Sequence, residues 1–162
     1  KFFSYPFGEY SSSLKKIVVE LGFKYAFGQH SGVVDYTKNL YEMPRFPINE
    51  KYGETERFKT ILKTLPFPYK LIQPEERYIS DKNNPPKVTI QFFENLKNLK
   101  NINCFSNEGD KWRNSKISLD NKNLKINLEE KFTTERGRIN CSLREKNGFY
   151  RWLGIQFVVK EK

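Results

Sequence analysis

The spacing of apolar residues changes once along this chain of 162 residues, and that change constrains the fold more than any other feature. Before position 66, apolar residues recur at the i, i+3, i+4 and i+7 positions of an amphipathic helix, as at Leu14, Ile17, Val18 and Leu21. After position 86 they alternate with polar residues, as in strands with one buried face. Prolines at positions 66, 68, 74, 85 and 86 interrupt regular elements in between. We therefore predict two domains, residues 1–68 and 87–162, joined by a Pro-rich linker, residues 69–86.

The first half of the chain predicts strands that alternate with helices. The aromatic run at 2–5 and the alternating residues 23–27 predict strands, and residues 45–48 predict a third, short strand. Serines at 11–13 and Gly22 bound the first helix, and a second apolar stripe ends at Pro66. Strands that alternate with helices pair in parallel, so we expect this half to form part of a βα barrel.

The second half predicts a sheet structure. Short alternating runs begin near positions 88, 117, 124 and 155, and turns rich in Asn and Gly separate them. This spacing is typical of a small antiparallel β-sandwich. The expected fold class is therefore α+β overall, with a partial βα-barrel segment followed by a small antiparallel β-sandwich.

The two cysteines, Cys104 and Cys141, lie on the apolar phase of two predicted strands, so both side chains should point into one core. They form a disulfide in an oxidising compartment or remain buried thiols, and the sequence leaves both states open. A metal site is not expected, because there is no Cys-x-x-Cys spacing and the single histidine is far away in the sequence.

The charge balance excludes some classes of partner. The 29 basic and 19 acidic residues give a net charge of +10, but the basic residues are spread over the polar faces of many predicted elements. A nucleic-acid-binding face clusters its basic residues, so we expect a solvated surface and no nucleic-acid partner. No apolar run of about 18 residues is present, so no membrane span is predicted.

A motif near position 2 carries the strongest functional signal. Residues 2–10, Phe-Phe-Ser-Tyr-Pro-Phe-Gly-Glu-Tyr, precede the first predicted helix, and residues 23–28, Phe-Lys-Tyr-Ala-Phe-Gly, follow it. This arrangement resembles the third motif of the polysaccharide deacetylases, which are metal-dependent carbohydrate esterases that remove N- or O-acetyl groups from polysaccharides. The resemblance extends less specifically over nearly the whole chain. It implies the C-terminal portion of the deacetylase catalytic domain followed by a C-terminal β module.

The chain departs from the usual family pattern in two ways. Ser4 stands where the common motif has an arginine, and the aromatic-Pro-aromatic-Gly-Glu-Tyr sequence is similar to a branch that includes enzymes acting on poly-N-acetylglucosamine. The Asp-Asp and His-x-x-x-His metal motifs of the family are not in the sequence. The resemblance therefore implies a hydrolase whose divalent metal, expected to be zinc, is held elsewhere in the parent enzyme. This portion is expected to hold no metal and to be inactive alone.

The resemblance also assigns roles to individual residues. The backbone amide of Phe7 would stabilise an oxyanion, with Gly8 allowing the close turn, although a plain strand-to-helix turn explains the same residues. Arg45 would support the catalytic carboxylate, or would simply lie at the surface. Substrate contacts are expected from Tyr5, Gly8, Glu9, Tyr10 and His30. Two of these have alternatives, because Glu9 would also suit a helix cap and His30 would also suit an exposed position.

Three functions compete. The leading hypothesis is a polysaccharide deacetylase portion, acting on N-acetylated sugars and located outside the cytoplasm, in a periplasm or at a cell surface. The alternative is a carbohydrate-binding or assembly module without catalytic activity, in which Trp112, Tyr150 and Trp152 stack on sugar rings rather than fill the sandwich core. The third is a binder of other polymers through basic charge. Because two βα units do not close a barrel, we also expect the missing N-terminal half, or another copy, to cover the open barrel edge.

Overall fold

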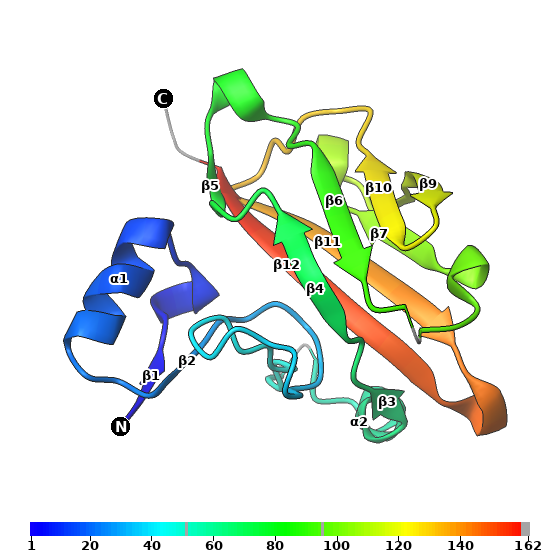
Figure 1. Ribbon diagram of the computed structural model, residues 1–162, viewed down its shortest axis with the longest axis horizontal. Helices are drawn as coiled ribbons and strands as arrows, with labels where there is room; N and C mark the ends of the chain where they lie inside the picture. The colour runs from blue at the N-terminus through cyan, green and yellow to red at the C-terminus, as the bar shows by residue number, and fades with distance from the viewer. Residues whose placement is uncertain (51, 95, 160–162) are drawn as a thin grey trace.

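Two β-sheets packed face to face make up most of the computed structural model, which describes residues 1–50, 52–94 and 96–159 (Figure 1). The four-stranded sheet is antiparallel and has the order β4-β6-β10-β9. The other sheet has the order β3-β12-β11-β7-β8, with β5 also paired to β12. The first sheet consists of β4 (Tyr69–Gln73), β6 (Val88–Phe92), β9 (Lys116–Asp120) and β10 (Asn123–Asn127). The second consists of β3 (Thr64–Leu65), β5 (Tyr78–Ile79), β7 (Asn103–Ser106), β8 (Arg113–Asn114), β11 (Arg136–Arg144) and β12 (Tyr150–Val159).

Alternation along β11 gives the six-stranded sheet one buried and one polar face. Ile139 and Cys141 are fully buried and lie opposite Ile155 and Leu153 of β12. Their side chains join those of the four-stranded sheet in one hydrophobic core. The intervening β11 positions are polar and face outward, and they are Arg136, Arg138, Asn140 and Ser142. This outer face is where the N-terminal region of the chain packs.

A disulfide joins Cys104 of β7 to Cys141 of β11. The two residues lie directly opposite each other in the antiparallel register, with their Cα atoms 4.0 Å apart, and both are fully buried. The predicted inward orientation is confirmed, and of the two states left open by the sequence the structure contains the disulfide. Because the bridge spans a sequence separation of 37 residues, it restricts the unfolded chain and contributes on the order of 4 kcal/mol to stability.

The N-terminal residues form a single βαβ unit. β1 (Phe2–Ser4) and β2 (Tyr25–Phe27) pair in parallel, and α1 (Ser12–Glu20) connects them. The helix begins at the predicted cap, where the Ser11 hydroxyl accepts a hydrogen bond from the Leu14 amide at 3.1 Å. Its apolar stripe is only half covered, because Val18 is buried whereas Leu21 is 63% exposed.

The expected partial βα barrel is wrong, and the protein is mostly β rather than α+β. In the described ranges, α1 and α2 (Thr55–Leu62) are the only α-helices, and β1 and β2 form a sheet of their own. Residues 45–48 form no strand, and the Phe46 ring packs edge-on against Trp152 at a centroid distance of 5.8 Å. The aromatic residue assigned to a barrel strand thus attaches this segment to the sandwich. Neither described helix has the length and apolar character needed to cross a membrane.

Residues 69–86, expected to be a linker, contribute strands to both sheets. β4 is an edge strand of the four-stranded sheet, and β5 pairs with the C-terminal end of β12. Phe67 and Ile79 are fully buried in the core. The prolines lie between these strands, so the expectation that they exclude regular elements is wrong here. Because β3 and β5 run parallel to β12, the sandwich is also not purely antiparallel. The position of the domain boundary stays a prediction.

The N-terminal region, residues 1–63, is attached along the edge of β12. Gly32 forms a β-bridge with Leu153, and the Gly154 amide donates a hydrogen bond to the Ser31 carbonyl at 2.7 Å. A Cβ atom at Gly154 would overlap the backbone of Ser31, so glycine is required for this close approach. The chain therefore crosses β12 between the positions where β3 and β5 pair with it.

Glu42 links the N-terminal region to the sandwich electrostatically. Its carboxylate accepts hydrogen bonds from the Tyr10 hydroxyl at 3.2 Å and from Arg77, in the β4–β5 connection, at 3.3 Å, and it also pairs with Lys15. Glu42 and Arg77 are both buried. Burial on its own raises the pKa of Glu42, but Arg77 and Lys15 together outweigh burial and lower the pKa below its ordinary value of 4.5.

We predict that Glu42→Gln lowers the free energy of unfolding at pH 7 by about 3 kcal/mol, because it leaves the buried Arg77 without its counter-charge. A carboxylate with a lowered pKa stabilises the fold above its unfolded pKa and loses that contribution as the pH falls through its folded pKa. The wild-type curve should therefore fall more steeply below pH 4.5 than the Glu42→Gln curve, as measured by urea denaturation.

Glu9→Gln is the matched control for this prediction. Glu9 pairs with Arg136 at 2.6 Å, but both side chains are partly exposed, so the loss should be below about 1 kcal/mol. Equal losses of unfolding free energy in the two variants would show that the Glu42–Arg77 pair contributes no more to stability than the partly exposed Glu9–Arg136 pair.

Candidate functional site

A cleft of about 380 Å³ lies where the N-terminal region covers the outer face of the six-stranded sheet. We call it the tryptophan cleft. One wall comes from β11, β12 and the segment before β8, and the other comes from two loops and α2 of the N-terminal region. The lining residues are Gln29, His30, Ser31, Pro47, Asn49, Tyr52, Arg57, Trp112, Arg138, Asn140, Trp152, Gly154, Ile155 and Gln156.

The strand register explains how the sheet supplies its polar wall. Arg138 lies opposite Gln156, and Asn140 lies opposite Gly154, so these outward positions form neighbouring cross-strand pairs. Gly154 carries no side chain, and this leaves room above the sheet for the loop at Ser31. The wall is therefore built by the polar phase of two long strands.

The two tryptophans of the protein differ in how firmly they are held. Trp152 donates its indole N–H to the Asn140 side-chain oxygen at 3.0 Å and packs against Phe46, so its orientation is restricted. Trp112 is 55% exposed. Neither belongs to the hydrophobic core, so the alternative that these rings fill the sandwich core is wrong. Tyr150, the third aromatic residue considered for stacking, does not line the cleft.

Two arginines give the cleft a positive charge. Arg57 comes from α2, with its guanidinium 5.0 Å from the centre of the Tyr52 ring, and Arg138 comes from β11. Among the described residues, no carboxylate forms an ion pair with either arginine, and no Asp or Glu lines the cleft. The site is therefore electropositive.

Three side chains at the cleft have enclosed polar atoms without a hydrogen-bond partner in the described parts of the chain. These atoms are Nδ1 of His30, Nε of Arg57 and Oε1 of Gln156. Gln156 is only 5% exposed, and its Nε2 donates to the Phe7 carbonyl at 3.3 Å. Buried polar atoms normally have partners. Unsatisfied atoms beside a cleft can bond a polar ligand.

His30 is neutral at physiological pH. Burial lowers its pKa most, Arg77 lowers it further, and Glu42 opposes both, with the result that the pKa is about 4. Its ring also lies against Tyr10, with centroids 6.3 Å apart. Neutral imidazole has one acceptor and one donor nitrogen, so at this position it can bond a hydroxyl group.

The motif at 5–10 lies directly behind the tryptophan cleft. The Phe7 carbonyl holds Gln156, and a side chain at Gly8 would overlap the backbone nitrogen of Gln29. Phe7 has a left-handed backbone conformation with φ 54°, which is uncommon for a residue other than glycine, and its ring is 67% exposed. The motif thus contacts Gln156 and Gln29, two residues that line the cleft.

The remaining residues predicted for the site have other surroundings. Tyr5 is buried, and its hydroxyl donates to the Tyr41 carbonyl at 3.1 Å. Tyr10 is also buried and bonds Glu42, and Glu9 pairs with Arg136. The Arg45 amide donates to the His30 carbonyl at 3.1 Å, while its enclosed Nε has no partner among the described residues. Of the residues that the deacetylase resemblance assigned to the site, only His30 lines the cleft.

Sequence reasoning missed the polar residues of the sheet wall and the helix. Arg57, Arg138, Asn140 and Gln156 occupy polar phases of predicted elements, where a solvated side chain is the ordinary expectation. The sequence did offer one indication, because the polar positions of the strands that carry Asn140 and Trp152 contain no acidic residue. That α2 contributes to the same cleft is known only from the fold.

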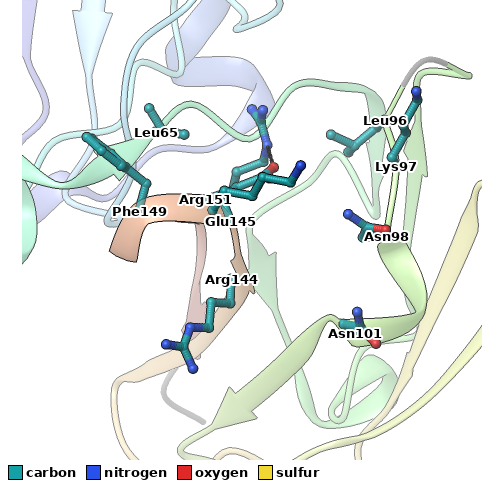
Figure 2. Close-up of a pocket in the computed structure, with 10 residues that line it drawn as sticks. Leu65, Leu96, Lys97, Asn98, Asn101, Arg144, Glu145, Phe149 and Arg151 are labelled. Carbon is teal, nitrogen blue, oxygen red and sulfur yellow. Dashed lines mark hydrogen bonds and ion pairs between the residues drawn. The ribbon is translucent and has the colours of Figure 1, made fainter.

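A second and larger hollow, of about 960 Å³, lies at the end of the sandwich near the β11–β12 turn (Figure 2). Leu65 and Phe149 lie on one side of it, and Leu96 and Lys97 lie on the other. Arg151 is held there by Glu145 at 2.6 Å and by the Pro66 carbonyl at 2.6 Å. We call it the basic hollow. It has no enclosed, unpartnered polar atom among its described lining residues, so the tryptophan cleft is the stronger candidate site.

Comparison with protein-family models, with curated proteins and with solved structures gave no match to this chain. Within the described ranges, no group of three or more His, Cys, Asp and Glu side chains is placed to hold a metal ion. The candidate site therefore has to be interpreted from its own chemistry.

We predict that Gly8→Ala weakens the fold and distorts the tryptophan cleft, because alanine disfavours the φ of +71° and its Cβ would displace Gln29. Gly148→Ala is the matched control, since its φ of +76° is similar but nothing lies within 4 Å of the added Cβ. The melting temperature should fall more for Gly8→Ala, and only that variant should shift the NMR signals of cleft residues. Equal effects in both variants would contradict contact between the motif and the cleft.

We also predict that the single histidine titrates near pH 4 in the folded protein. A histidine with a lowered pKa binds its proton more readily when unfolded, so stability should decline as the pH falls from 6.5 toward 4. Imidazole NMR shifts recorded against pH give the value directly. A midpoint near 6.5 would show that His30 is solvated.

Proposed function

We propose that the tryptophan cleft binds a polysaccharide. A sugar ring presents an apolar face of C–H bonds and a rim of hydroxyl groups. The cleft has matching features, with aromatic rings at Trp112 and Trp152 and amide or imidazole groups at Asn140, Gln156 and His30. The observation that carries the proposal is the enclosed, unpartnered polar atoms of Gln156 and His30, two residues that line the same cleft as the tryptophans.

The dimensions of the cleft support this proposal. Its volume of about 380 Å³ is within the range of about 300–1,000 Å³ typical of ligand pockets, toward the smaller end. Trp112 is 55% exposed, so part of the lining is accessible from solvent. The restrained ring of Trp152 provides a preformed stacking surface, which reduces the entropy lost on binding.

We further propose that this binding belongs to a polysaccharide deacetylase. The support is the resemblance of residues 2–10 and 23–28 to the third motif of that family, together with the contact of this motif with the back of the cleft at Gln156 and Gln29. The family's Asp-Asp and His-x-x-x-His motifs are not in this sequence. In this proposal another part of the enzyme would hold a metal that activates water, and the present residues hold the polymer. An oxyanion role for the Phe7 amide stays a prediction.

The disulfide supports an extracytoplasmic location for this function. Disulfides persist in oxidising compartments and are rare in reducing ones. The bridge between Cys104 and Cys141 is fully buried and joins the strands beside the polar wall of the cleft. A periplasm or cell surface, where polysaccharides are also found, agrees with it.

We predict that Trp112→Ala weakens polysaccharide binding at least about tenfold, or 1.4 kcal/mol, because it removes the exposed stacking surface. Binding is measured by calorimetry with the polymers that the wild-type chain retains on a glycan array. Phe105→Ala is the control, because Phe105 is 43% exposed and does not line the cleft. Failure to bind any polysaccharide, or equal affinity of both variants, would refute the proposal.

Acetate release distinguishes a polysaccharide deacetylase from a carbohydrate-binding module without catalytic activity. The intact natural protein supplied with zinc should release acetate from an acetylated polymer that binds the cleft. Binding without acetate release would support the non-catalytic carbohydrate-binding module instead.

A further inference from the structure

We infer that the polysaccharide held in the tryptophan cleft is acidic, with a uronic-acid carboxylate bound by Arg57 and Arg138. This inference rests on the proposed function, because it names the sugar class for the same cleft. It adds a charge preference, which stacking on Trp112 and Trp152 does not require.

The pairing of the other arginines provides the first argument. Of the five other arginines that are buried or partly buried, four have carboxylate partners: Arg77 pairs with Glu42, Arg113 with Glu130, Arg136 with Glu9 and Arg151 with Glu145. Arg45 is the exception, and its enclosed Nε has no partner among the described residues. Arg57 and Arg138 are also partly buried, yet no described carboxylate pairs with either of them.

Leaving these two charges unpaired has an energetic cost. A partly buried cation loses hydration, and an ion pair normally compensates for that loss. The two guanidinium groups come from α2 and β11, elements distant in the sequence that both contribute to the lining of this cleft. A ligand carboxylate placed between them would restore the missing compensation.

The chemistry of the remaining lining narrows the anion to one on a sugar. Guanidinium forks match the planar geometry of a carboxylate. The other polar groups are neutral, and they include the unpartnered Oε1 of Gln156 and Nδ1 of His30. Such groups suit hydroxyls, which a uronic-acid chain carries beside every carboxylate. A nucleic acid would place its charges on phosphates along a strand, and the cleft has only two cations for them.

The basic hollow differs from the cleft in how its charges are arranged. Lys97, Arg144 and Lys146 line the hollow and are exposed, and Arg151 is already paired with Glu145. Exposed cations of this kind attract anions without geometric selection. The hollow therefore provides a second basic site on the same molecule as a control.

The test uses the full chain and two matched oligosaccharides, oligogalacturonate and its carboxyl-reduced, neutral form. By calorimetry at 150 mM salt, the acidic form should bind at least about tenfold more tightly than the neutral form. Arg138→Gln should reduce this preference to below about threefold, because affinity for the acidic form should fall more than affinity for the neutral form. Arg138→Lys, which keeps the charge without the planar fork, should give an intermediate preference. Arg144→Gln, in the basic hollow, should leave the preference intact.

Each other outcome has a defined meaning. Equal binding of the two oligosaccharides by the wild-type chain would overturn the acidic preference and leave the proposed polysaccharide binding in place. Binding of neither, with no polymer retained on the array, would overturn both. An equal loss of preference in Arg144→Gln and Arg138→Gln would show diffuse attraction and refute the site. Tighter binding of single-stranded RNA than of oligogalacturonate, competing at the cleft, would also refute it. Melting temperatures confirm that each variant is folded.

Discussion

The buried carboxylate of Glu42 is the interaction on which the arrangement of this protein depends. It lies in the N-terminal region and meets Arg77 from the sandwich, with Lys15 and Tyr10 completing its partners. A buried charge pair contributes little net stability compared with apolar packing, but breaking it is costly because one charge remains unpaired. Its main effect here is therefore to specify one way for the βαβ unit to sit against the sheets. Apolar contacts alone would tolerate small shifts.

This specification matters because the tryptophan cleft has walls from both regions. His30 and Arg57 come from the N-terminal region, whereas Trp152, Arg138 and Gln156 come from the six-stranded sheet. A small displacement of the N-terminal region relative to the six-stranded sheet would alter the distances across the cleft. Glu42 also lies close enough to His30 to oppose the lowering of its pKa. The same carboxylate therefore influences both the geometry and the electrostatics of the site.

The sequence allowed local structure to be predicted better than its assembly. The first helix with its Ser11 cap, the strand Val88–Phe92 and the turns rich in Asn follow from nearest-neighbour chemistry, and the structure contains them. The barrel was wrong because the βαβ pattern specifies parallel pairing but not how many units follow it. Of the cleft, the two tryptophans and His30 could be proposed in advance. Arg138 could not be proposed in advance, because only the folded structure shows that it lacks a carboxylate partner among the described residues.

One edge of β12 is shared by three segments: β3 at its start, Gly32 in its middle and β5 at its end. β12 is the last strand in the described chain, whereas Gly32 precedes most of the other strands. The bridge between Gly32 and Leu153 consequently closes a loop of about three quarters of the 162-residue chain, which gives it a large sequence separation. During synthesis on the ribosome this bridge cannot form until β12 has emerged, long after Gly32. Translation speed and chaperone access would thus bear on this protein more than on one whose early segments pair with each other.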